Sequence, residues 1–139
     1  MNEADVKTVQ ASFEKLMPIA DQVGRLLYAE LFAAHPELRP MFATDIEPQA
    51  KKLVQMLAVV VKSLDKLPTI LPTVENLAQR HRHYGVADEH YAMVGTALIA
   101  TLQRVLGEAF TPAVKQAWIS AYAALSGVMM TAARAPAAA

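Results

Sequence analysis

Apolar residues recur along this chain mostly at steps of three and four positions, rather than at every second position. This spacing is typical of helices that bury one face, because an α-helix completes a turn about every 3.6 residues. One such stripe consists of Leu53, Leu57, Val60 and Leu64. The pattern predicts an all-α fold, and no segment of the chain reads convincingly as a β-strand.

Prolines and capping residues predict where the first helices begin and end. The first two helices should cover about residues 4–17 and 19–34, followed by a short helical turn near 36–42. Each of the two long helices stops close to a proline, because the residue before a proline avoids the α region. A third long helix should follow a cap at Thr44 or Asp45, with Pro48 in its first turn, and end near Asp65.

The second half of the chain carries similar signals. Pro68 and Pro72 indicate a connection, after which a shorter helix should run to a C-terminal glycine at Gly85. The next helix should extend over about residues 88–106, with Asp88 as its cap and a glycine after its end. Thr111-Pro112 should open the last helix, as a cap followed by a first-position proline.

The composition excludes several classes of function. The chain of 139 residues has the size of one domain, and 13 basic against 13 acidic residues give a formal net charge of +0. Without a basic field, nucleic acid is not expected as a partner. The absence of cysteine removes disulfides, thiolate nucleophiles and cysteine-ligated metal centres.

We also expect no segment that would direct the chain to a membrane. Residues 1–5 carry acid where a signal peptide carries base, and no apolar region follows them. The longest uncharged stretch, 116–133, contains polar residues and is shorter than the ~20 apolar residues of a transmembrane helix. We therefore expect a cytoplasmic protein with no membrane partner.

His81 is the histidine that completes an apolar helix face. The face consists of Val74, Leu77, Ala78 and His81. A neutral imidazole in this position could ligate a metal or, as an ordinary core histidine, bond a backbone carbonyl. A zinc site of His81, His83 and His90 is disfavoured, because residues two apart on a helix point in different directions.

Three blocks of sequence decide between these alternatives. They are residues 28–42 (YAELFAAHPELRPMF), residues 80–86 with 90–95 (RHRHYGV and HYAMVG), and Ala117-Trp118 with Ala121-Tyr122. In order and spacing they resemble bacterial single-domain globins and the globin part of flavohaemoglobins, and the resemblance covers nearly the whole chain. It implies a globin fold over residues 1–134, a helical sandwich enclosing a haem, with an alanine-rich tail at 135–139.

The resemblance also implies a cofactor and its contacts. His81 corresponds to the axial ligand of a haem iron, which makes it the metal-binding residue. The haem should be haem b, since no cysteine is available for covalent attachment. The implied haem contacts are Phe42, Leu53, Tyr91 and Val94.

On the distal side, the resemblance assigns ligand-binding roles to Tyr28, Gln49 and Leu53. Gln49 lies seven residues after Phe42, and Leu53 follows one helical turn later on the same face. A phenol O–H and an amide N–H stabilise dioxygen, which becomes partly negative on ferrous iron, more than they stabilise carbon monoxide. Taken alone, Gln49 could be a solvated residue and Tyr28 a core aromatic.

Two functions fit such a pocket. One is reversible binding of dioxygen for storage, delivery or sensing, and the other is conversion of nitric oxide to nitrate by the oxygenated form. The five glycines cannot compose a dinucleotide fingerprint, so we expect the reductant to come from a separate reductase. A haem-free helical protein of the bacterial stressosome type is a third alternative, which His81, Phe42 and the distal pair argue against.

One departure from the family pattern affects the chemistry. No carboxylate side chain follows Glu108, whereas the last helix of flavohaemoglobin-like globins usually supplies a glutamate. In the family this acid acts on the proximal imidazole through a tyrosine that matches Tyr91. Less electron donation from His81 is therefore expected, and with it less peroxidase-like cleavage.

Overall fold

The computed structural model describes residues 2–42, 44–83 and 88–134, and of residues 67, 68, 70, 71, 81–83, 88 and 131–134 it describes the backbone alone. The α-helices in these ranges are α1 (Glu3–Glu14), α2 (Ala20–Ala34), α3 (Glu47–Lys62), α4 (Leu67–His83), α5 (Asp88–Leu106) and α6 (Pro112–Arg134). Short 3-10 helices lie between them: η1 (Met17–Ile19), η2 (Pro36–Met41), η3 (Leu64–Lys66) and η4 (Gly107–Ala109). Within these ranges no strand occurs, which confirms the predicted all-α fold.

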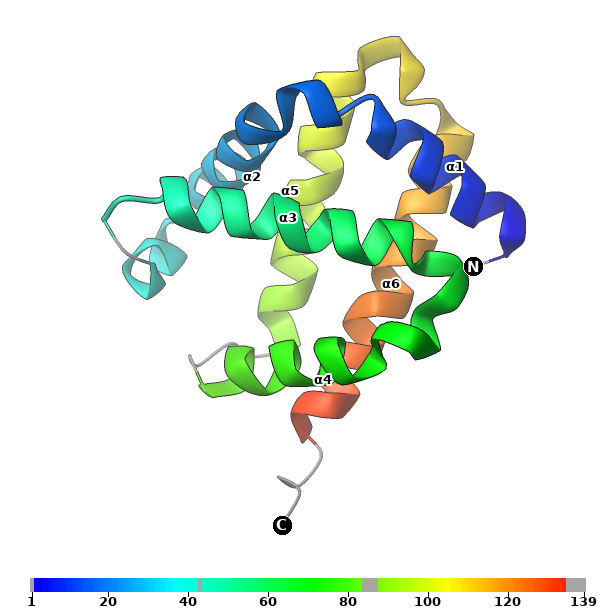
Figure 1. Cartoon of the computed structure of the whole chain (residues 1–139). Helices are drawn as coiled ribbons and strands as arrows, with labels where there is room; N and C mark the ends of the chain where they lie inside the picture. Colours follow the sequence, from blue (N-terminus) through cyan, green and yellow to red (C-terminus); the bar gives the residue numbers. More distant parts are fainter. Residues whose placement is uncertain (1, 43, 84–87, 135–139) are drawn as a thin grey trace.

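The helices pack at steep angles rather than as a parallel bundle (Figure 1). α2 packs against α3 and α5, while α6 packs against α1, α4 and α5. In Figure 1, α3 runs across α5, and α4 runs across the lower part of α6. The chain passes from α3 to α4 through η3, which contacts both helices. In the part of the chain described here, no helix is both long and apolar enough to cross a lipid bilayer.

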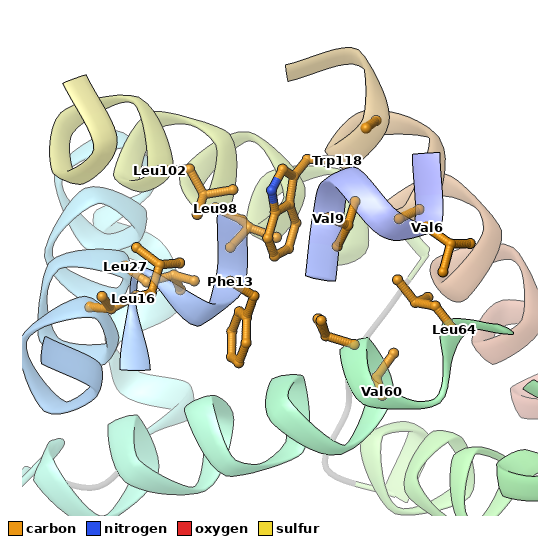
Figure 2. Packing of buried hydrophobic residues seen from close by; sticks show 14 residues of the cluster. Val6, Val9, Phe13, Leu16, Leu27, Val60, Leu64, Leu98, Leu102 and Trp118 are labelled. Atoms are coloured by element: carbon orange, nitrogen blue, oxygen red, sulfur yellow. The ribbon is translucent and has the colours of Figure 1, made fainter. Parts of the chain in front are cut away.

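The largest hydrophobic cluster takes most of its buried residues from α1, α2, α3, α5 and α6 (Figure 2). Trp118 of α6 lies beside Val9 and Phe13 of α1, and all three side chains are buried. The indole Nε1 of Trp118 donates a hydrogen bond to Oγ of Ser12 at 2.8 Å. The Ser12 hydroxyl in turn donates to the carbonyl of Val9, so this buried polar pair is satisfied within the core.

The Trp118–Ser12 hydrogen bond gives a testable prediction for stability. Ser12→Ala should lower the free energy of unfolding by about 1–3 kcal/mol, because it leaves the buried indole N–H without its acceptor. Urea unfolding of Ser12→Ala, Trp118→Phe and the double variant measures the coupling between the two sites. In the Trp118→Phe background, Ser12→Ala should cost much less. Equal costs in both backgrounds would contradict the assigned role of the bond.

The structure corrects one predicted boundary. Pro68 and Pro72 do not form a connection, because α4 already begins at Leu67 and contains both prolines. A proline in the first turn loses no helical hydrogen bond, and Pro72 removes one from the next turn. The helix persists because Val74 and Ala78 are buried against Met129 of α6. Packing of the apolar face thus outweighs the local signal of the prolines.

Other helix ends follow the sequence with smaller differences. α1 ends at Glu14 rather than near residue 17, and η1 follows it. The residue at the cap of α3 is Ile46, which makes no side-chain capping bond, so the prediction of a cap at Thr44 or Asp45 is wrong. Asp45 instead accepts a hydrogen bond from the backbone N–H of Glu47 at 3.1 Å.

At the other end of the chain, two predicted signals are confirmed. Thr111 accepts a hydrogen bond from the N–H of Val114 at the start of α6. Gly107, directly after α5, has a positive φ of 55°, which glycine adopts without strain. The predicted helix end at Gly85 and the tail at 135–139 lie outside the described residues.

Candidate functional site

Three aromatic rings pack together where α2 meets the segment before α3. Tyr28 and Phe32 lie one turn apart on α2, with ring centroids 5.8 Å apart. Phe42, directly after η2, packs edge-on against both, at 5.4 Å from each. The ring of Phe42 is therefore fixed on two sides by α2, although Phe42 itself belongs to no helix.

Tyr28 carries the polar group of this cluster. Its side chain is buried, with 5% of its surface exposed, and burial raises the pKa of the phenol. Nε2 of Gln49 donates a hydrogen bond to the Tyr28 hydroxyl at 3.2 Å, which offsets the rise of the pKa in part. The hydroxyl thus accepts from Gln49 and retains its own proton, which can be donated to a third group.

Close contact between α2 and α3 brings Tyr28 and Gln49 together. A Cβ atom on Gly24 of α2 would lie 2.7 Å from the carbonyl oxygen of Ala50, so glycine is required for this approach. Beside it, Nε of Arg25 lies 3.0 Å from a carboxylate oxygen of Glu47 in the first turn of α3. The contacts that hold α2 against α3 therefore lie within about one helical turn of both Tyr28 and Gln49.

The apolar residues predicted for the site lie in the same cluster as Tyr28. Phe42, Leu53 of α3 and Val94 of α5 are partly buried and pack against it. The fully buried members are Tyr28, Leu31, Leu38, Ala50 and Ala97. Gln49 is exposed at the edge of this cluster, and only its amide reaches inward to Tyr28.

Tyr91 lies in a different cluster, together with Val74 and Ala78 of α4 and Met129 of α6. These two α4 residues belong to the predicted stripe of His81, which lies in the last turn of α4. The side chain of His81 lies outside the part of the chain that the structure describes. The sequence-predicted residues thus divide between a cluster at α2, α3 and α5 and a cluster at α4, α5 and α6.

Two polar residues next to these clusters were not predicted from the sequence. Tyr122 of α6 donates its hydroxyl to the backbone carbonyl of Tyr91 at 2.6 Å, and its ring lies against Gly95. Burial, and to a lesser extent the negative charge that Tyr91 carries when it is ionised, raises the pKa of Tyr122. Arg39 of η2 contacts the segment that carries Phe42. The Tyr122 contact depends on how α5 and α6 pack, and the acceptors of Arg39 are backbone carbonyls, so neither contact has a signature in the local sequence.

An open groove of about 580 Å³ lies between α5 and α6. Residues lining it include Tyr91, Thr96, Ile99, Ile119, Tyr122 and Met130. It shares Tyr91 with the predicted site, but Tyr28, Gln49 and Leu53 do not line it. The groove is therefore distinct from the cluster that carries the polar pair.

Comparison with known proteins is consistent with this geometry. The Globin family model matches residues 25–129, which include α3, α4, α5 and most of α2 and α6. The chain is 34% identical over 125 residues to a flavohemoprotein of Bordetella parapertussis, and the alignment covers 88% of this chain and 31% of that protein. It is 32% identical over 129 residues to a flavohemoprotein of Bacillus subtilis, covering 88% of this chain and 32% of that protein.

A third relative is a flavohemoprotein of Vibrio cholerae, 31% identical over 121 residues, with coverage of 82% of this chain and 31% of that protein. The chain therefore spans about a third of the length of the curated relatives that it matches.

Proposed function

This chain belongs to the globin family, and from that premise we propose that it carries haem b and binds dioxygen reversibly. In this proposal His81 of α4 is the iron ligand, and the haem contacts are Phe42, Leu53, Tyr91 and Val94. Tyr28 and Gln49 bind the gas on the distal side, with Leu53 beside them. The observation that carries the proposal is the hydrogen bond from Gln49 to a buried Tyr28 inside an apolar cluster.

The residues present fit a haem. Phe42, Leu53, Met93 and Val94 are only partly buried, so α3 and α5 present apolar surface next to Tyr28 that a flat apolar ring could cover. A phenol placed among such residues supports a polar ligand as its further partner, because buried O–H groups are normally hydrogen-bonded. The family relationship supplies the identity of the cofactor as haem.

Each distal residue has a different role in binding dioxygen. Bound haem would supply a ferrous iron with an open coordination position for a diatomic ligand. The Tyr28 hydroxyl, which stays protonated because burial raises its pKa, donates a hydrogen bond to dioxygen. Gln49 orients this hydroxyl through its amide, and Leu53 and Val94 limit the access of water. Carbon monoxide and nitric oxide fit the same space and gain less from the hydrogen bonds.

Substitution of the polar pair tests the distal assignment. Tyr28→Phe and Gln49→Leu should each speed dioxygen release about fivefold, because one hydrogen bond contributes on the order of 1 kcal/mol. Stopped-flow release of dioxygen from the ferrous protein measures the rate. Gln55→Leu is the matched control, since Gln55 is an exposed residue of α3 outside the Tyr28 cluster. Unchanged release in both distal variants would contradict the assignment.

We also propose nitric oxide dioxygenation as a second function of the same pocket. It is supported by the similarity to flavohemoproteins, whose name denotes both a flavin and a haem protein. Bound haem would supply the one electron that is needed to combine nitric oxide with dioxygen as nitrate, and a separate reductase would return that electron. Nitrate formation that is sustained only when a flavin reductase and its reductant are added would support this function, and absence of nitrate would exclude it.

A further inference from the structure

The side chain of Arg39 in η2 makes several contacts on one side of the aromatic cluster. Its Nη2 donates to the backbone carbonyl of Thr44 at 2.6 Å, and its Nη1 donates to the carbonyl of Phe42 at 3.5 Å. The centre of the guanidinium lies 5.2 Å from the centroid of the Phe32 ring. One half-buried side chain therefore joins α2 to the connection between η2 and α3.

Other contacts of this connection are the packing of the Phe42 ring against Tyr28 and Phe32 and the hydrogen bond from the Glu47 N–H to Asp45. Phe42 has an extended backbone, with φ of −120° and ψ of 157°, and its N–H donates to the carbonyl of Arg39. The first turn of α3 has no side-chain cap at Ile46. Arg39 thus binds Phe42 through its backbone and its side chain, and it reaches the residues that lead directly into α3.

We propose that Arg39 is a positioning residue for the proposed haem and ligand pocket. Its guanidinium binds the carbonyls of Phe42 and Thr44 while it lies over the ring of Phe32, and so it fixes the ring of Phe42 and the start of the helix that carries Gln49. This inference rests on the proposed function and assigns Arg39 no direct contact with the gas. The ring of Phe42 then determines how the haem sits, and the start of α3 determines how Gln49 meets Tyr28.

The role requires the geometry of arginine rather than its charge. A planar guanidinium can donate to two carbonyls and lie over an aromatic face at the same time. Lysine keeps the positive charge, but its compact ammonium lacks the planar fork whose two nitrogens reach the two carbonyls while the group lies over the Phe32 ring. Arg39→Lys is therefore the informative substitution, because it preserves charge and length.

Three measurements on the haem-loaded Arg39→Lys protein test the proposal. Haem transfer to an excess of another apo-globin should be several-fold faster than in the parent. Proton NMR of the ferric cyanide form should show a changed ratio of the two haem orientations that differ by a half-turn. Dioxygen release should also be faster, since Gln49 is held less firmly against Tyr28. Phe32→Leu, which removes the ring under the guanidinium, should shift the orientation ratio as well.

Arg104→Lys is the matched control, because Arg104 is an exposed arginine whose Nη2 pairs with Glu30 at 2.7 Å, away from Phe42. It should leave all three readouts at the parent values. If Arg39→Lys and Arg104→Lys both match the parent in haem loss and orientation ratio, the inference is overturned while the proposed function stands. If the parent chain takes up no haem, both are overturned.

Discussion

His81→Ala is expected to produce a protein that folds but no longer retains haem with the spectrum of the parent. In the proposed site the His81 imidazole would hold the iron, so its loss would remove this bond to the metal. The helix itself should persist, because Val74 and Ala78 of α4 are buried against α6 independently of the last turn. The two effects are separable: far-ultraviolet circular dichroism reports the helices, and the visible absorption reports the haem.

His35→Ala and His90→Ala are the controls for this experiment. His35 lies at the end of α2, where its Nδ1 is 3.2 Å from a carboxylate oxygen of Glu37, and His90 lies in the first turn of α5. Both variants should retain the haem and its spectrum. Free imidazole added to His81→Ala should restore part of the parent spectrum, because it can occupy the vacated position. An unaltered spectrum in His81→Ala would show that another residue ligates the iron.

Periodicity was sufficient to predict the helices of this fold, because each helix buries one face. The predicted stripe does face the main core: Val60 and Leu64 are buried in it, and Leu53 and Leu57 pack against it. The prediction was wrong at Pro68 and Pro72, where local backbone preference and tertiary packing point in opposite directions. A sequence pattern cannot weigh a lost hydrogen bond against the burial of residues on the same helix, so boundaries of this kind require the structure.

The candidate site shows a similar division. The pairing of Tyr28 with Gln49 was suggested by family spacing, and the hydrogen bond between them places the two side chains together. The contacts of Arg39 were not predictable, because its acceptors are backbone carbonyls at Phe42 and Thr44. Every residue type has a backbone carbonyl, so the identities of residues 42 and 44 do not indicate that Arg39 binds them. The roles of these residues toward haem stay predictions.

Gly24→Ala is expected to disturb the fold and the site together. The added methyl would lie 2.7 Å from the carbonyl oxygen of Ala50 and 3.1 Å from its carbonyl carbon and its Cβ. These are mostly backbone atoms of a helix, so the contact is relieved only if α2 and α3 move apart. Overpacking of this kind costs about 1–3 kcal/mol. This cost should exceed the stabilisation of up to about 1 kcal/mol that replacing glycine by alanine brings to a helix interior.

Separation of the two helices should also weaken the distal pair. Gln49 belongs to the same turn of α3 as Ala50, and Tyr28 lies one turn after Gly24 on α2, so the 3.2 Å hydrogen bond between them should lengthen. Dioxygen release from Gly24→Ala should then approach the rate of Gln49→Leu, without any change to a polar side chain.

Gly127→Ala is the matched control, because Gly127 lies inside α6 and a Cβ there would meet no atom within 4 Å. This variant should be as stable as the parent or more so, by up to about 1 kcal/mol, since alanine favours the helix. Urea unfolding and dioxygen release measured on both variants separate the general effect of alanine from the contact at Ala50. If Gly24→Ala matches Gly127→Ala in both measurements, the α2–α3 contact does not determine the geometry of the pocket.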